Sequence, residues 1–270
     1  MPEGLAGFIF LIPWGLCLGS FATALIARIP AGRSWIASRA KAERSACPHC
    51  GHRLGVRDLI PLFSWLFLRG RCRYCGHPVG WRYPAVECLT LLMCWVVYAA
   101  WGWNAQGLVL LVAVPFLVSM LVIDLEHMIL PDQLQVILFV LGLVFVSFGG
   151  GPVVDACSSA LLASLVYFAV AYALAKGGAL VFRRDALGMG DVKFFGVAGL
   201  WLGWLALPAF MMIAGIGGVL LGLGWKFVVR SPRFPFGPAL IFSFFILLLM
   251  RAPVVSAWLN PFLQTLPGLS

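Results

Sequence analysis

Eight long apolar segments separated by short polar connections dominate this sequence. They cover residues 5–28, 85–103, 107–125, 133–149, 154–180, 191–206, 208–229 and 237–257. A helix needs ~20 mostly apolar residues to cross the hydrocarbon core of a bilayer. A soluble chain of 270 residues could not bury a composition that is 62% hydrophobic and 11% charged, with a mean hydropathy of +0.98. The sequence therefore predicts an all-α polytopic membrane protein with about eight transmembrane helices.

One polar stretch interrupts this pattern and divides the chain into three predicted regions. Residues 1–28 form the first transmembrane helix, residues 29–84 form a small loop domain, and residues 85–270 form a seven-helix membrane core. The loop domain is basic and rich in glycine and proline. It is too short to build a large hydrophobic core, and domains of this size often need a metal or a disulfide to fold.

The positions of the basic residues predict the orientation of the chain in the membrane. Eleven of the 19 Lys and Arg residues lie between Arg28 and Arg82, and seven more lie in or beside every second later connection. Only Arg251 falls on the opposite side. Because basic loops stay in the cytoplasm, residues 29–84 are expected to be cytoplasmic and both termini external. The net charge of +9 is thus a topology signal. No aromatic–basic recognition module is visible, so a nucleic-acid partner is not expected.

Four cysteines in the loop form two nearly identical knuckles. They are Cys47-Pro-His-Cys50-Gly-His and Cys72-Arg-Tyr-Cys75-Gly-His, with 21 residues between Cys50 and Cys72. In each knuckle a tight turn presents two thiolates, so two knuckles supply the four sulfurs that a tetrahedral Zn²⁺ site requires. Since the cytoplasm is reducing, metal binding is favoured over a redox dithiol or unliganded thiols. A site with four cysteine ligands has no open position for water, so the zinc is expected to be structural. His49, His52 and His77 are interpreted as polar surface groups.

Two aspartates lie at the edges of apolar segments, on the predicted cytoplasmic side. Asp124 follows Val122-Ile123, and Asp191 follows Gly188-Met189-Gly190. A carboxylate costs ~2.5–3.5 kcal/mol at a helix centre on insertion scales, and less toward a helix end. Paired carboxylates that share a proton are typical of aspartic proteases. The pair therefore indicates an intramembrane-type aspartyl protease, in which either aspartate could act as the base.

Simpler explanations exist for each acidic residue. Asp191 could cap the sixth helix, and Asp124 could pair with Lys193. Asp132, after Pro131, is expected in the first turn of the fourth helix. The remaining nearby polar groups are interpreted as interfacial residues, Glu126 and His127, while the role of Glu87 stays open.

Two other classes of protein compete with a protease. A proton- or ion-coupled transporter also carries intramembrane carboxylates, but near the middle of the bilayer rather than at its edge. A zinc-knuckle assembly factor would leave the two aspartates apart. The distance between Asp124 and Asp191 in the fold discriminates these alternatives.

The motifs together resemble the bacterial type IV prepilin peptidases, bifunctional leader peptidase/N-methyltransferases of the GxGD aspartic class. The resemblance runs over nearly the whole chain and includes both cysteine knuckles, Trp81-Arg82-Tyr83-Pro84 with Glu87, Leu130-Pro131-Asp132, Gly188-Met189-Gly190-Asp191 and Pro235-Phe236-Gly237-Pro238. The chain departs from the family pattern at Thr23 and at Asp58-Leu59-Ile60-Pro61.

This resemblance implies an activity and its partners. It implies that Asp124 and Asp191 are catalytic, and that the substrates are prepilins and type II secretion pseudopilins cleaved at the cytoplasmic face of the bacterial inner membrane. It also implies methylation of the new N-terminus with S-adenosylmethionine. No glycine-rich nucleotide motif identifies a pocket for that methyl donor.

Overall fold

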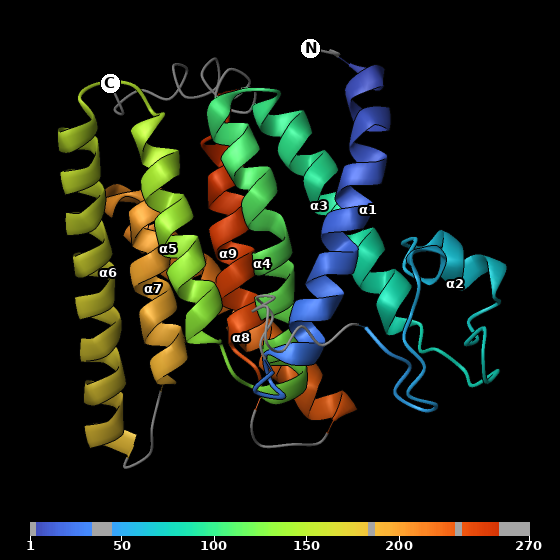
Figure 1. The fold of residues 1–270 in the computed structure, drawn as a ribbon. Helices are drawn as coiled ribbons and strands as arrows, with labels where there is room; N and C mark the ends of the chain where they lie inside the picture. Colours follow the sequence, from blue (N-terminus) through green and yellow to red (C-terminus); the bar gives the residue numbers. More distant parts are fainter. Residues whose placement is uncertain (1–3, 34–44, 183–186, 230–233, 254–270) are drawn as a thin grey trace. The chain divides into compact units, whose positions relative to one another are not determined.

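The computed structural model describes residues 4–33, 45–182, 187–229 and 234–253. Eight long helices account for most of these residues, and a short helix and two 3₁₀ turns complete the described elements (Figure 1). The helices are α1 (Leu5–Arg28), α2 (Phe63–Phe67), α3 (Arg82–Trp101), α4 (Ala105–His127), α5 (Asp132–Ser147), α6 (Val153–Phe182), α7 (Met189–Leu202), α8 (Leu207–Val228) and α9 (Gly237–Met250). Within the described ranges the only β-structure is a pair of isolated bridges, so the all-α prediction is confirmed.

Each predicted apolar segment contains one long helix, but eight transmembrane spans are not confirmed. In the part of the chain that the structure describes, five helical segments are long and apolar enough to cross a bilayer: Leu5–Arg28, Arg82–Trp101, Ala105–His127, Val153–Leu180 and Trp204–Val228. α7 has 14 residues, which at 1.5 Å per residue reach only ~21 Å of the ~30 Å hydrocarbon core. For this helix, the length of the apolar segment in the sequence overestimates the length of the helix in the structure.

Local signals explain where the helices around the site begin and end. α4 begins after Asn104, whose side chain accepts a hydrogen bond of 2.7 Å from the Gly107 N–H. It ends at Met128, which adopts the left-handed conformation at φ 56°. Pro131 is the N-cap residue of α5, a position where its missing N–H breaks no helical hydrogen bond. α7 ends at Gly203, at φ 72°, rather than at the predicted residue 206.

The chain forms two compact units. The first contains residues 1–98 with 114–119, and the second contains residues 99–113 and 120–270, among the described residues of each range. In the first unit, α1 packs closely on α3. A Cβ at Gly19 would lie only 2.6 Å from the Glu87 Cα, so this close approach requires glycine. The boundaries predicted at residues 28 and 84 separate membrane helices from a loop domain. The two compact units do not test them, so they stay a prediction.

In the second unit, α7 is the buried central helix. It packs against α5, α6 and α9, and Figure 1 shows it in orange beside α5 and α6. Every residue from Phe194 to Leu202 is buried. A helix that is apolar on all faces is stable only inside such a core. The packing of α7 fixes its first turn, which carries Asp191.

Candidate active site and metal centre

Asp124 and Asp191 line one cavity in the second unit. Asp124 lies in the last turn of α4, and Asp191 lies in the first turn of α7. The cavity has a volume of about 270 Å³, and the α4–α5 connection and the residues before α7 complete its lining. Asp124 is 4% exposed, and Asp191 is partly buried. The structure thus brings together the two carboxylates that the sequence singled out.

A backbone N–H at the start of α9 holds the Asp124 carboxylate. The Gly237 N–H donates a hydrogen bond of 2.8 Å to Asp124 Oδ2. A Cβ at position 237 would lie 2.6 Å from that oxygen, so α9 can approach this closely only through a glycine. The N-terminus of a helix favours a negative group through its free N–H groups and its dipole. Gly237 was not predicted as a site residue, although its place between two prolines was the available signal.

The two glycines before Asp191 act through close packing rather than unusual backbone angles. Gly188 has φ −66°, Gly190 lies within α7, and neither adopts a positive φ. A Cβ would lie 3.1 Å from Asp191 Oδ2 at position 188, and 3.2 Å from the Leu130 Cβ at position 190. The expectation that these glycines admit a substrate backbone stays a prediction. In the structure, the contacts that their missing side chains permit lie within the protein.

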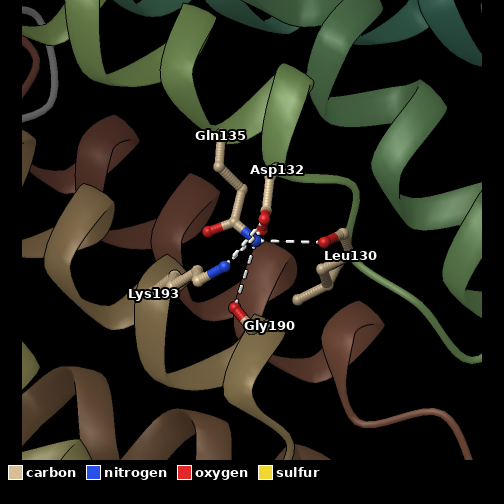
Figure 2. A network of polar contacts seen from close by, with 5 residues as sticks. All are labelled: Leu130, Asp132, Gln135, Gly190 and Lys193. Atoms are coloured by element: carbon tan, nitrogen blue, oxygen red, sulfur yellow. Dashed lines mark hydrogen bonds and ion pairs between the residues drawn. The ribbon is translucent and has the colours of Figure 1, made fainter.

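Gln135 links the α4–α5 connection to the start of α7. Its Nε2 donates to the carbonyl oxygens of Leu130 and Gly190, each at 3.2 Å (Figure 2). The residue is 3% exposed, and its Oε1 has no hydrogen-bond partner among the described residues. A polar group this deeply buried is expensive unless it is paired, so its two bonds indicate a structural requirement. Gln135 was missed in the sequence, where a glutamine within the apolar run after Pro131 was the signal.

Lys193 pairs with Asp132, not with Asp124. Lys193 Nζ lies 2.7 Å from Asp132 Oδ2, and Figure 2 shows the pair beside Gln135. The alternative in which Lys193 neutralises Asp124 is therefore wrong. Asp132 occupies the first turn of α5 as expected. Both side chains are well exposed, at 45% and 65%, so the pair contributes only ~0–1 kcal/mol.

The other acidic candidates lie elsewhere. Glu126 and His127 do not line the cavity, and His127 Nε2 lies 3.9 Å from Glu126 Oε2. Glu87 belongs to the first unit, where its carboxylate accepts a 2.7 Å hydrogen bond from the Leu62 N–H.

The four knuckle cysteines form a cluster in the first unit that fits a metal. The Sγ atoms of Cys47, Cys50, Cys72 and Cys75 all lie within 4.8 Å of one another, and those of Cys47 and Cys75 are 3.9 Å apart. Tetrahedral coordination with Zn–S bonds of ~2.3 Å separates the sulfurs by ~3.8 Å. Backbone N–H groups of Cys50 and then His49 lower the pKa of Cys47 to about 6. The spacing of the four sulfurs suits Zn²⁺.

The two knuckles have the same backbone and pack on each other reciprocally. In each, the first cysteine N–H donates to the histidine carbonyl five residues later, at 2.9 Å from Cys47 and 2.8 Å from Cys72. Gly51 and Gly76 both adopt φ 69°, which only glycine tolerates readily. Across the knuckles, the rings of His49 and His77 stack with their centroids 4.1 Å apart, and those of His52 and Tyr74 meet at a tilt of 30° with their centroids 3.6 Å apart. The exposed histidines thus pack against the opposite knuckle.

Asp58 connects the apolar stretch between the knuckles to the second knuckle. Its carboxylate accepts hydrogen bonds from Arg73 Nε at 2.7 Å, Tyr74 Oη at 3.0 Å and the Gly55 N–H at 3.0 Å. The hydrogen bond from Arg73 is the main reason that the pKa of Asp58 lies below its usual range. The position at which this chain departs from the family pattern therefore organises the loop.

Comparisons with known proteins place the chain among membrane peptidases. Residues 14–101 match the bacterial peptidase A24 N-terminal domain, and residues 111–223 match the type IV leader peptidase family. A prepilin leader peptidase/N-methyltransferase from Aeromonas hydrophila is 34% identical over 95% of this chain and 95% of its own length. One from Myxococcus xanthus is 39% identical over 80% of this chain, which spans 62% of that relative. No solved structure matches the chain.

These matches cover both units and both cysteine knuckles. The fold and the paired-carboxylate cavity define a multi-pass membrane protein of the peptidase A24 class. More specifically, the chain belongs to the type IV leader peptidase family.

Proposed function

We propose that this protein is a membrane aspartic endopeptidase that removes the leader peptides of type IV prepilins and type II secretion pseudopilins. The observation that carries the proposal is that Asp124 and Asp191, from different helices, line one cavity. The relatives' names supply the substrate class, since they are called prepilin leader peptidases.

The proposed chemistry uses the two carboxylates as a general acid and a general base. One ionised carboxylate takes a proton from a water molecule as that water attacks the scissile carbonyl carbon. The other, protonated, donates to the carbonyl oxygen and later protonates the departing amine. Because neighbouring carboxylates titrate together, the proton belongs to the pair rather than to one residue.

The two carboxylates have different surroundings, which supports different roles for them in the reaction. The Gly237 N–H engages Asp124 Oδ2, which leaves the other oxygen of Asp124 available to the cavity. Asp191 lies beside Gly188, where a Cβ would stand 3.1 Å from Asp191 Oδ2, so the absence of a side chain leaves that oxygen uncrowded.

Cleavage is proposed to occur on the cytoplasmic side of the bacterial inner membrane. The distribution of Lys and Arg supports this orientation. A substrate with a basic leader followed by an apolar helix would already be anchored in the bilayer. The junction between leader and helix would then lie near the C-terminal end of α4 and the N-terminal end of α7.

Two further properties belong to the proposal. The four-cysteine cluster holds a structural Zn²⁺, for which its sulfur spacing is suited. The new N-terminus is then methylated, with S-adenosylmethionine supplying the methyl group, as the names of the relatives suggest.

The transporter alternative has less support. Coupled transporters place their carboxylates near mid-bilayer. Here Asp124 lies three residues before the end of α4, and Asp191 is the third residue of α7. The family matches are to peptidases.

The proposal is tested by leader cleavage in membranes that contain Asp124→Asn or Asp191→Asn. Loss of an acid or base group is expected to slow cleavage by roughly 10²–10⁴-fold in each variant. Asp155→Asn, an exposed acid in the first turn of α6, is the matched control and should cleave normally. Zinc content and membrane level should not change in any of the three. Near-normal cleavage by either cavity variant would refute the two-carboxylate mechanism.

A further inference from the structure

The stretch between the two cysteine knuckles exposes a continuous set of apolar side chains. Val56 is 86% exposed and Phe67 is 83% exposed. Other large apolar side chains of this stretch are exposed by 42–52%: Leu59, Ile60, Phe63 and Leu66. We call residues 56–68 the apolar loop segment. A water-facing connection of ordinary composition would not collect so many apolar groups, so this surface indicates a partner.

Many backbone N–H groups of the apolar loop segment donate hydrogen bonds within the protein. The N–H groups of Ser64, Leu66 and Leu68 donate to carbonyls four residues earlier, at 3.0–3.1 Å. The N–H groups of Leu59 and Phe63 also find carbonyls within the segment. In hydrocarbon an unpaired backbone group costs several kcal/mol, whereas in water it would be satisfied by solvent. This pairing is what a lipid-facing segment needs.

A buried carboxylate on α3 pairs with one more N–H group of the segment and fixes the position of the segment along α3. Leu62, held at φ 60°, donates its N–H to Glu87 Oε2 at 2.7 Å. Glu87 is 7% exposed and lies five residues after Arg82, where α3 begins. At 1.5 Å per residue, this contact lies ~7.5 Å along the helix from its polar end. Figure 1 shows α2 beside the first turns of α3.

The charges around the segment suit the surface of a bilayer. Arg57 and Arg69, both exposed, stand near its two ends, with no other basic residue between them. The one acidic residue of the segment, Asp58, is turned to Arg73, Tyr74 and Gly55. Trp81, 76% exposed, immediately precedes α3, and tryptophan is enriched at membrane–water interfaces. Apolar groups flanked by arginine and tryptophan match lipid tails flanked by anionic headgroups.

We infer that the apolar loop segment inserts into the headgroup and outer acyl region of the leaflet from which α3 emerges. The zinc module is then a membrane-seated element rather than a free cytoplasmic loop. Glu87 positions it by accepting the Leu62 N–H at the depth where water is scarce. The occupant of this surface is the lipid bilayer itself.

The inference is tested by fluorine NMR of the whole protein in nanodiscs that contain phosphatidylglycerol, with one chain per disc. Trifluoromethyl-phenylalanine is placed at position 67 or, separately, at position 56. Leu92, 54% exposed on α3, provides the lipid reference, and exposed Arg53 on the first knuckle provides the aqueous reference. Relaxation is compared between dissolved oxygen, which concentrates in lipid, and a gadolinium chelate, which stays in water.

The expected oxygen-to-gadolinium relaxation ratio at position 67 is close to that at position 92, and about fivefold or more above that at position 53. Position 56 should follow position 67. A ratio at both positions like that of residue 53 overturns the inference. Shielding from both reagents also overturns it, because the segment would then be covered by protein. Unchanged zinc content of the labelled proteins shows that the module has folded.

Discussion

At the scale of single residues, Asp124 depends on a backbone group for its position. The Gly237 N–H reaches Asp124 Oδ2 because no side chain stands between α9 and α4. A glycine needed for close approach has no tolerant substitute, since even one methyl group must displace the carboxylate or the helix. This residue therefore offers a sharper test of the cavity than the aspartates themselves.

Replacing Gly237 with alanine is expected to reduce leader cleavage strongly. The added Cβ would meet Asp124 Oδ2 at 2.6 Å and Asp124 Cγ at 2.8 Å. A displacement of about 1 Å at reacting groups can cost roughly 10²-fold in rate. Single-turnover cleavage in membranes measures the effect.

The control for this variant is Gly224→Ala in α8. Nothing lies within 4 Å of a Cβ at that position, so its cleavage rate and membrane level should match the unmodified protein. If Gly237→Ala cleaves as fast as Gly224→Ala, the Gly237–Asp124 contact has no part in the reaction.

The carboxylate pair could be predicted from the sequence, but its supports could not. Asp124 and Asp191 stand out because acidic residues at the edges of apolar segments are costly and therefore rare. Gln135 and Gly237 acquire their roles only when α5, α7 and α9 pack around the α4–α5 connection. No periodicity or spacing in the chain encodes those approaches. The catalytic roles themselves remain predictions.

At the scale of elements, the cysteine module also combines features that the sequence predicts with features that only the fold reveals. Two CxxC pairs with matching glycines suffice to predict the ligand set, because ligand chemistry is local. The reciprocal ring contacts, His49 with His77 and Tyr74 with His52, depend on how the two knuckles pack against each other. Likewise, hydropathy overextended α7 to residue 206, since it counts apolar residues and does not detect the turn at Gly203.

Removal of one knuckle thiol is expected to release the metal and loosen the loop. Cys72→Ser should reduce zinc from about one ion per chain to nearly none, because structural zinc sites need all four ligands. Elemental analysis measures the metal, and limited proteolysis of residues 45–81 measures the loosening. Cys88→Ser, an exposed single cysteine in α3, is the matched control. Full zinc retention by Cys72→Ser would exclude the four-cysteine site.

At the scale of the whole molecule, the two compact units correspond broadly to the two family matches. The N-terminal match, residues 14–101, falls largely in the first unit, and the leader peptidase match, residues 111–223, falls largely in the second. Fold class could be predicted from composition alone. The number of membrane crossings could not, because α5, α7 and α9 are too short to span a bilayer by length alone.

The division of the chain into two compact units predicts that a mutation can abolish leader cleavage without abolishing methyl transfer. Asp191→Asn, which alters the cavity of the second unit, is expected to abolish leader cleavage. It should still transfer methyl groups to a mature peptide supplied without its leader. Incorporation of labelled methyl from S-adenosylmethionine measures the second activity. Loss of methyl transfer in a stably folded Asp191→Asn protein would show that one site performs both reactions.

The dependence of Asp124 on Gly237 also has a consequence for biosynthesis. The proposed catalytic cavity depends on a hydrogen-bond donor from α9, far downstream of α4 and α7. A nascent polypeptide whose translation has not reached residue 237 already contains both acids, yet lacks the amide that orients one of them. We therefore expect the proposed proteolytic activity to arise late in synthesis, after most of the chain has been inserted into the bilayer.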